Sequence, residues 1–257
     1  MIDSHCHIEQ KEYDLNREKL ISELKNELDA IVTVCAHPAD FEKALKIARE
    51  HKGFVFLVAG LHPEYVKDFN ENQIDHYFQK IEDNKEDVVA IGETGLDFFW
   101  IKDHNLQKKQ KELFQEHIDF SKDLKKPLVI HSREAYEEVI KTLEQEDVKK
   151  AQLHMWGEKN LVKRAIDDQF MISINTILLR SKEHKKIAID TPLENLMLET
   201  DSPWLAPKQL LEGIKEINTP LSVKIVADKI SEIKKIPLEQ IDQLTTQNAK
   251  DFFGIKS

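Results

Sequence analysis

The sequence predicts an α/β fold in which parallel strands alternate with helices, as in a single (β/α)8 TIM barrel. Two observations lead to this prediction. Short apolar runs rich in β-branched residues recur eight times, and segments with helical spacing of apolar residues lie between them. An open doubly wound sheet fits the same count. No glycine-rich fingerprint follows the first run, however, which disfavours the dinucleotide-binding form of that sheet.

The expected strands are spread evenly along the chain. They cover residues 1–3, 30–35, 54–59, 88–92, 127–131, 151–154, 170–174 and 195–199. Gly53 is placed to end the second helix, and Pro220 to begin a late one. Pro237 and Gly254 bracket a terminal pair of short helices. No repeat or linker divides the chain, so residues 1–257 are expected to form one domain.

Composition narrows the class of protein. The chain has 257 residues, of which 40% are hydrophobic and 33% charged, and no apolar run is long enough to span a bilayer. The N-terminus lacks a basic start followed by an apolar stretch, and two cysteines cannot form a disulfide framework. We therefore expect a cytoplasmic protein that does not bind membranes, and nothing indicates an obligate protein partner.

The charge balance limits how the chain can hold nucleic acid. Lys and Arg number 37 and Asp and Glu 47, which gives a net charge of −10. Broad electrostatic capture of duplex needs a basic face, because counterion release supplies the affinity. The acidic balance argues against such capture, whereas a polyanionic substrate is compatible with the chain if metals or a local basic rim contact its phosphates.

Polar residues able to bind metals follow the expected strands. His5 and His7 are two apart in an extended segment, so their imidazoles point the same way. Four further candidates end later strands: Glu93, His131, His154 and Asp201. The carboxyl ends of barrel strands meet at one face, where barrel enzymes place their chemistry. Four histidines and two carboxylates there suit divalent ions such as Zn²⁺ or Mn²⁺.

Six ligands exceed the needs of one tetrahedral site, which favours two ions sharing a carboxylate. A paired site can activate a water, polarise the bond to be cleaved and stabilise an oxyanion leaving group, so hydrolysis is the expected reaction. Ser132 and Ser202 adjoin candidate ligands but lack the context of a nucleophile elbow.

Several motifs resemble the TatD family of metal-dependent deoxyribonucleases, which belongs to the amidohydrolase-like barrels. They are Asp3-Ser4-His5-Cys6-His7, Gly60-Leu61-His62-Pro63, Gly92-Glu93-Thr94-Gly95-Leu96-Asp97-Phe98, His131-Ser132-Arg133-Glu134-Ala135, Glu199-Thr200-Asp201-Ser202-Pro203 and Asn248-Ala249-Lys250. The similarity covers almost the whole chain in the family's order.

The resemblance implies two divalent ions, Mg²⁺, Mn²⁺ or Zn²⁺, and a ligand set for each. The first ion would be held by His5, His7, Glu93 and Asp201, and the second by Glu93, His131 and His154. Glu93 would be the bridging ligand, and Asp201 would also orient or deprotonate the water. Asp3 is either a partner that orients an imidazole or a plain strand-end residue.

Two loops depart from the family pattern. His154-Met155-Trp156-Gly157 stands where His-Cys-Phe-Ser-Gly is usual, and the metal-binding histidine is retained. Asn218-Thr219-Pro220 stands where an Arg-Asn-Glu-Pro-like element is common, so an expected arginine is absent. Both changes concern loops expected to contact substrate.

Substrate contacts are predicted around the same rim. Trp100, Trp156 and Trp204 follow the fourth, sixth and eighth strands, where they could form a stacking wall for exposed bases. Arg133 is the first candidate for a phosphate clamp, because a guanidinium binds phosphate bidentately. His62 either contacts phosphate or packs beside the following proline.

These observations predict a two-metal deoxyribonuclease acting on DNA, with Glu93 and Asp201 as catalytic residues and single strands or frayed ends as substrate, cleaved exonucleolytically. One alternative is a hydrolase of another bond, such as the ester of D-aminoacyl-tRNA or a small amide or lactone. A second is a non-catalytic, metal-stabilised binding barrel.

Overall fold

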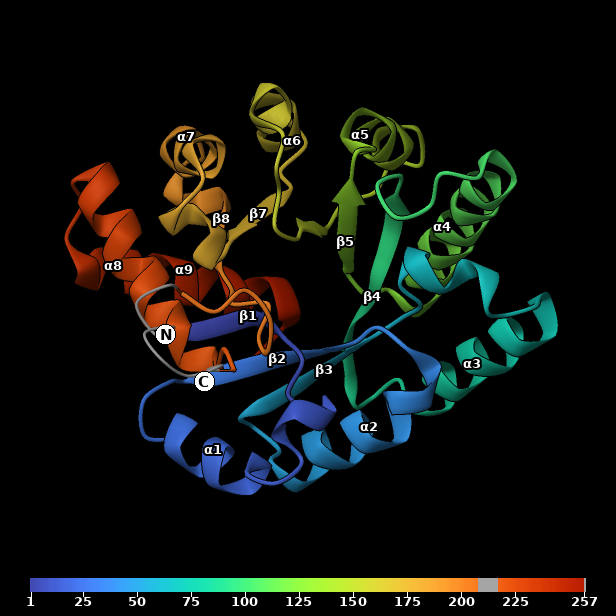
Figure 1. Cartoon of the computed structure of the whole chain (residues 1–257), viewed down its shortest axis with the longest axis horizontal. Helices are drawn as coiled ribbons and strands as arrows, with labels where there is room; N and C mark the ends of the chain where they lie inside the picture. Colours follow the sequence, from blue (N-terminus) through green and yellow to red (C-terminus); the bar gives the residue numbers. More distant parts are fainter. Residues whose placement is uncertain (208–216, 257) are drawn as a thin grey trace.

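The computed structural model describes residues 1–207 and 217–256, and its sheet is a nearly closed barrel ringed by helices (Figure 1). Each strand pairs in parallel with the next along the chain, in the order β1 to β8. The strands are β1 Ile2–Cys6, β2 Ala30–Cys35, β3 Val55–Ala59, β4 Val88–Asp97, β5 Leu128–Arg133, β6 Ala151–Leu153, β7 Met171–Ile174 and β8 Leu196–Leu198. The prediction of a (β/α)8 barrel is therefore confirmed.

Hydrogen bonds near the ends of β1 and β8 join the first strand to the last. The backbone N–H of Asp201 donates to the carbonyl of His5 at 2.9 Å, and that of His7 donates to the carbonyl of Ser202 at 2.8 Å. These bonds replace a regular ladder between β1 and β8. They hold the segment after β1 beside the segment after β8, both of which carry candidate ligands.

Three strands run further than the sequence suggested. The first reaches Cys6 instead of residue 3, β4 reaches Asp97 instead of residue 92, and β5 reaches Arg133 instead of residue 131. β4 continues because Gly95, at φ +132°, lies so close to β5 that a Cβ there would be 2.1 Å from the carbonyl oxygen of His131. Only glycine permits this approach. The extension puts Glu93 inside the strand instead of at its end.

Helices cover the outside of the sheet (Figure 1). They are α1 Arg17–Leu24, α2 Phe41–Glu50, α3 Glu71–Asp83, α4 His104–Leu124, α5 Tyr136–Gln145, α6 Val162–Asp167, α7 Lys182–Asp190, α8 Val223–Lys234 and α9 Leu238–Phe253. The terminal segment forms one helix where two short ones were expected, and α8 begins at Val223, after a 3-10 turn that starts at Pro220. None of the described helices combines the length and apolarity needed to cross a membrane.

The core has two parts, divided by the sheet. Outward-facing strand residues such as Ile31 and Leu57 pack against the surrounding helices. Inward-facing residues such as Val58 and Val129 fill the barrel and pack with Phe252 of α9. This inner apolar cluster occupies the end where the strands begin, which leaves the end where they finish for polar side chains.

Candidate metal centre

Alternation along the strands carries polar side chains into the barrel mouth. Val129 of β5 faces the barrel interior, so His131, two residues on, faces the same way. Met197 of β8 likewise faces inward, and Asp201 lies four residues beyond it. Successive inward positions thus change from apolar side chains to side chains able to bind a metal at one end of the barrel.

Glu93 lies at the centre of the cluster and its two carboxylate oxygens face different histidines. Oε2 lies 3.6 Å from Nε2 of His5. Oε1 lies 2.9 Å from Nδ1 of His131 and 3.8 Å from Nε2 of His154. Each oxygen therefore points to a separate group of nitrogen ligands, as a carboxylate shared by two ions requires.

Asp201 faces the other side of the cluster. Its Oδ1 lies 3.3 Å from Nε2 of His7, 3.9 Å from Nε2 of His154 and 4.0 Å from Nε2 of His5. The Asp201 backbone has φ +55°, a conformation that aspartate tolerates better than most residues. Its side chain is 15% exposed, against 5% for Glu93, so Asp201 is the more open of the two carboxylates.

Hydrogen bonds on the far side of two imidazoles assign their tautomers. Nδ1 of His7 donates to the carbonyl of Val34 at 2.7 Å, and Nδ1 of His154 donates to Oε2 of Glu199 at 3.0 Å. In each neutral ring the lone pair is then on Nε2, which faces the carboxylates. This is the arrangement by which proteins present histidine to a metal.

His5 supplies the clearest sign that a cation belongs here. Both of its ring nitrogens are buried, and neither has a hydrogen-bond partner among the described residues. Its ring is stacked on that of His154, with centroids 3.6 Å apart. A buried polar nitrogen without a hydrogen-bond partner lowers the stability of the folded state. A divalent ion between His5 and Glu93 would give such a nitrogen a partner. The donor set therefore fits a metal.

Burial and mutual charge shift the pKa values of the cluster in opposite directions. Burial, followed by repulsion from His154, lowers the pKa of His5. Burial also lowers the pKa of His154, but Glu199 and Glu93 outweigh it and raise that pKa to about 9. Burial raises the pKa of Glu93, but the surrounding histidines outweigh it and hold the pKa well below its usual value. The ionised carboxylates thus make the mouth a place where positive charge is favoured.

His62 also lies in the cluster, with Nε2 3.7 Å from Oε1 of Glu93. Its Nδ1 accepts a hydrogen bond from the backbone N–H of Glu64 at 3.1 Å, and burial lowers its pKa to about 3. A neutral imidazole whose Nδ1 is an acceptor carries its proton on Nε2. His62 therefore presents a hydrogen-bond donor to the site. One of its ring nitrogens also lies within 4.8 Å of ligand atoms of Glu93 and His131, a spacing at which all three could bind one ion.

Three carboxylates behind the histidines were not singled out from the sequence. Oδ2 of Asp97 lies 2.9 Å from Nε2 of His131, and Oε1 of Glu9 lies 3.7 Å from Nδ1 of His7. Glu199 contacts His154. Strand alternation could have indicated two of them. Asp97 lies four residues after Glu93 and Glu199 two residues before Asp201, so in an extended segment each points to the same side as its candidate ligand.

Among the described residues, Asp3 makes no hydrogen bond to an imidazole. Its Oδ1 accepts from the backbone N–H of His5 at 3.2 Å and from that of Thr200 at 3.0 Å, and its Oδ2 accepts from the Thr200 hydroxyl at 2.6 Å. Asp3 therefore holds together the two backbone segments that carry candidate ligands. It acts as a structural residue of β1 and does not orient an imidazole through a hydrogen bond.

The structure corrects the expected wall of three tryptophans. Trp156 is completely buried, where its Nε1 donates to the carbonyl of Glu158 at 2.8 Å and its ring packs edge-on against Tyr136. Such a side chain offers no face to a base. Trp100 and Trp204 are 59% and 46% exposed and remain available.

The two exposed tryptophans border the metal centre on different sides. The ring of Trp204 lies 4.8 Å from that of His7. The guanidinium carbon of Arg133 lies 3.8 Å from the ring centroid of Phe99 and 5.3 Å from that of Trp100. Arg133 also follows His131 by two residues on β5, so it extends from the same face of the strand toward the mouth.

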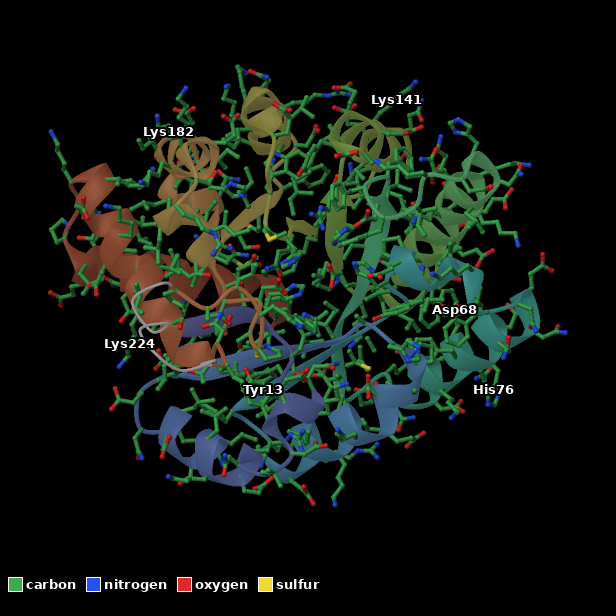
Figure 2. All side chains as sticks on the ribbon, viewed as in Figure 1. Tyr13, Asp68, His76, Lys141, Lys182 and Lys224 are labelled. Carbon is green, nitrogen blue, oxygen red and sulfur yellow. The ribbon has the colours of Figure 1, made fainter. Side chains whose placement is uncertain are left out.

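The altered loop after β8 has a structural role of its own. The side-chain N–H groups of Asn218 donate to the carbonyls of Thr200, at 3.2 Å, and Trp204, at 2.6 Å. The hydroxyl of Tyr13, which lies inward of the surface lysines in Figure 2, donates to the carbonyl of Asn218 at 2.6 Å. Asn218 therefore anchors the loop that carries Trp204, and in this chain the position is structural.

The chain is similar to known metal-dependent hydrolases along almost its whole length. A family model described as TatD-related DNase matches residues 2–254. An uncharacterised metal-dependent hydrolase from Methanocaldococcus jannaschii is 34% identical, over 98% of this chain and 96% of its own length. The deoxyribonuclease TATDN3 from Homo sapiens is 29% identical, over 98% of this chain and 94% of its own length.

Solved structures show the same fold. A TatD homologue from Escherichia coli superposes with a TM-score of 0.89 at 22% identity, covering 100% of this chain and 98% of that one. An N-acetyl-D-glucosamine-6-phosphate deacetylase from Mycobacterium smegmatis superposes with a TM-score of 0.63 at 10% identity, covering 99% and 77%. The barrel is thus shared with amidohydrolase-like enzymes. Taken with the family match along nearly its whole length, this shows that the chain belongs to the TatD family of metal-dependent hydrolases.

Proposed function

We propose that this chain is a deoxyribonuclease that hydrolyses the phosphodiester bonds of DNA with two divalent ions, Mg²⁺, Mn²⁺ or Zn²⁺. The observation that carries the proposal is the position of Glu93, whose two carboxylate oxygens face His5 on one side and His131 on the other. One ion would be held by His5, His7, Glu93 and Asp201, and the other by Glu93, His131 and His154. The name of the human relative supports DNA as substrate.

When bound, the ions would supply Lewis acidity and lower the pKa of water at the site. The side chains of the chain perform the remaining tasks. Asp201, the more exposed of the two catalytic carboxylates, is placed to orient the attacking water and to accept its proton. The Nε2–H of His62 donates to a phosphate oxygen. Arg133, held by its stacking on Phe99, binds a second phosphate oxygen.

A single strand or a frayed end suits this mouth better than a duplex does. Trp100 and Trp204 expose their rings on two sides of the cluster, and every base has a face that can stack on an indole. The net charge of −10 argues against broad capture of duplex. We therefore propose exonucleolytic cleavage of unpaired DNA.

The test is hydrolysis of single-stranded DNA labelled at the 5′ or at the 3′ end. Metal-stripped protein is resupplied with Mg²⁺, Mn²⁺ or Zn²⁺ in separate reactions. Glu93→Ala removes the shared carboxylate, and Glu82→Ala, on the exposed surface of α3, is the matched control. We expect metal-dependent shortening from one end in the wild type and in Glu82→Ala, and none in Glu93→Ala.

A second substrate class is tested with the same proteins. If no metal supports DNA cleavage but the wild type hydrolyses the ester of D-aminoacyl-tRNA in a Glu93-dependent manner, the metal chemistry is retained and the substrate is corrected. If Glu93→Ala cleaves DNA as fast as the wild type, the proposed metal centre is wrong.

A further inference from the structure

A basic pocket opens at the opposite end of the barrel from the metal centre. Its volume is about 760 Å³, and it is lined by residues that begin strands, such as Val88 of β4 and Pro127 just before β5. Glu93 lies five residues after Val88 on β4, or about 16 Å at the rise of a strand. The pocket is therefore separate from the catalytic mouth.

The pocket gathers lysines from segments that are distant in the sequence. The six are Lys122, Lys125, Lys126, Lys149, Lys150 and Lys256. They come from the end of α4, the loops before β5 and β6, and the segment after α9. Three acidic residues also line the cavity, so its formal charge is +3 in a chain whose net charge is −10. At physiological salt charges act over about 8 Å, so a ligand in the cavity experiences the local charge.

Most of these lysines are not neutralised by the protein. Lys122 pairs with Glu146, and Lys149 pairs with Asp147. In the part of the chain that the structure describes, the other four lysines have no ion pair or side-chain hydrogen bond. They are Lys125, Lys126, Lys150 and Lys256. Four ammonium groups around one cavity are four unused donors for an anion.

Register brings two of the free lysines to neighbouring strand starts. Leu128 of β5 pairs with Ala151 of β6, and Lys126 lies two residues and Lys150 one residue before that pair. The backbone N–H of Leu128 also donates to the carbonyl of Lys150 at 3.0 Å, which fixes this arrangement. The lysines are thus carried on backbone that directly precedes the strands of the sheet.

Most of the remaining lining is apolar. Val88, Ile118 and Phe252 are buried and contribute to the cavity wall. A cavity of this volume with an apolar wall and a few charged groups has the size and character of a small-ligand site. The ammonium group of lysine binds phosphate as a compact positive charge. Several ammonium groups around one cavity can therefore bind a ligand that carries several phosphates in a row.

We propose that this pocket binds an oligophosphate group, either free or as the phosphate tail of a nucleotide whose ring lies on the apolar wall. The proposal does not depend on the substrate of the metal centre, because no residue that lines this pocket belongs to that centre. It gives the barrel a second anion site at the end where the strands begin.

The test is calorimetric titration of the metal-loaded full chain with inorganic triphosphate, with ATP and with adenosine, at 0.15 M salt and constant excess Mg²⁺. The pocket variant is Lys126→Glu with Lys150→Glu. The control is Lys141→Glu with Lys182→Glu, which makes the same change of net charge at exposed lysines on the outside of the molecule (Figure 2). Binding of triphosphate to the metal centre contributes equally to both.

We expect triphosphate and ATP to bind at least tenfold more weakly to the pocket variant, with no more than a twofold change in the control, and adenosine alone not to bind. Equal affinities for triphosphate and ATP would identify free oligophosphate as the ligand, and tighter ATP binding would identify a nucleotide. Equal weakening in both variants, or adenosine binding as tight as ATP, would overturn the proposal.

Hydrogen exchange on the wild type gives a readout that does not depend on folding of a variant. With triphosphate bound, residues 125–127 and 148–151 should gain protection. Protection confined to the segments after β5, β6 and β8 would show that the anion occupies only the metal centre, and the pocket would not be a site.

Discussion

Nδ1 of His154 donates to Oε2 of Glu199 at 3.0 Å, and this bond turns Nε2 of the same ring toward Glu93 and Asp201. Glu199 is itself completely buried and accepts from the backbone N–H of Met155 at 3.0 Å. A candidate ligand histidine is thus oriented by a carboxylate that cannot rotate freely. The relationship leads to the first prediction.

Replacing Glu199 with Gln should weaken metal binding by about tenfold, since outer partners of metal-binding histidines are worth 10- to 100-fold in affinity. The amide cannot accept from His154 with the strength of a carboxylate. Competition with a coloured chelator measures the change. The matched control is Glu194→Gln, the same substitution at an exposed position before β8. Unchanged affinity in Glu199→Gln, in a folded protein, would contradict the assigned role.

Trp100 and Trp204 should contribute to single-strand binding through stacking. Changing both to Ala is expected to weaken affinity for a short single strand by roughly 2 kcal/mol, because each base–indole contact is worth about 1–3 kcal/mol. Fluorescence anisotropy with an uncleaved strand on metal-free protein measures this. Ile189→Ala removes an apolar side chain that is 51% exposed on α7, and it should leave affinity unchanged. Equal affinities in all three proteins would rule out the stacking role.

His117 should make the folded protein sensitive to acid. Burial lowers its pKa from 6.5 to about 4, opposed by its hydrogen bond to the Leu113 carbonyl, and its Nε2 accepts from the backbone N–H of Leu61 at 3.0 Å. As the pH falls below 6.5, His117 becomes protonated in the unfolded chain, whereas in the folded chain it stays neutral until the pH approaches 4. The contribution of neutral His117 to the free energy of unfolding is therefore fully present above pH 6.5. It falls by about 3 kcal/mol as the pH drops to about 4.

Urea unfolding of metal-free wild type and His117→Gln between pH 7 and pH 4 isolates this contribution. Other groups titrate alike in both proteins, so the gap between their unfolding free energies should shift in favour of the variant as the pH falls. A gap that stays constant over that range would falsify the prediction.

Gly95→Ala should destabilise the barrel strongly. Its φ is +132°, and an added Cβ would meet the His131 carbonyl oxygen at 2.1 Å, so backbone strain and a clash add to about 3 kcal/mol or more. Gly53, at φ +87° with nothing within 4 Å, provides the control for strain alone, and Gly53→Ala should cost about 1 kcal/mol. Urea midpoints compare the two. Similar losses would show that the close approach to β5 does not matter.

Much of the centre was predictable because barrel strands obey simple rules. His131, His154 and Asp201 follow apolar strands, and parallel strands end at a common face. The motif around Glu93 adds the shared carboxylate. Local sequence did not show that β4 runs on to Asp97, because that depends on the close approach of Gly95 to the neighbouring strand.

The sequence by itself determined the order of strands and helices, the candidate metal-binding residues and the family, since these depend on periodicity and on motifs of neighbouring residues. The tertiary structure alone decided which groups meet across the barrel. It buried Trp156 against Tyr136, paired His154 with Glu199, and brought Lys126 and Lys150 to one pocket, with no ion pair to either among the described residues. Burial and charge pairing depend on contacts between residues far apart in the chain, and no local pattern encodes them.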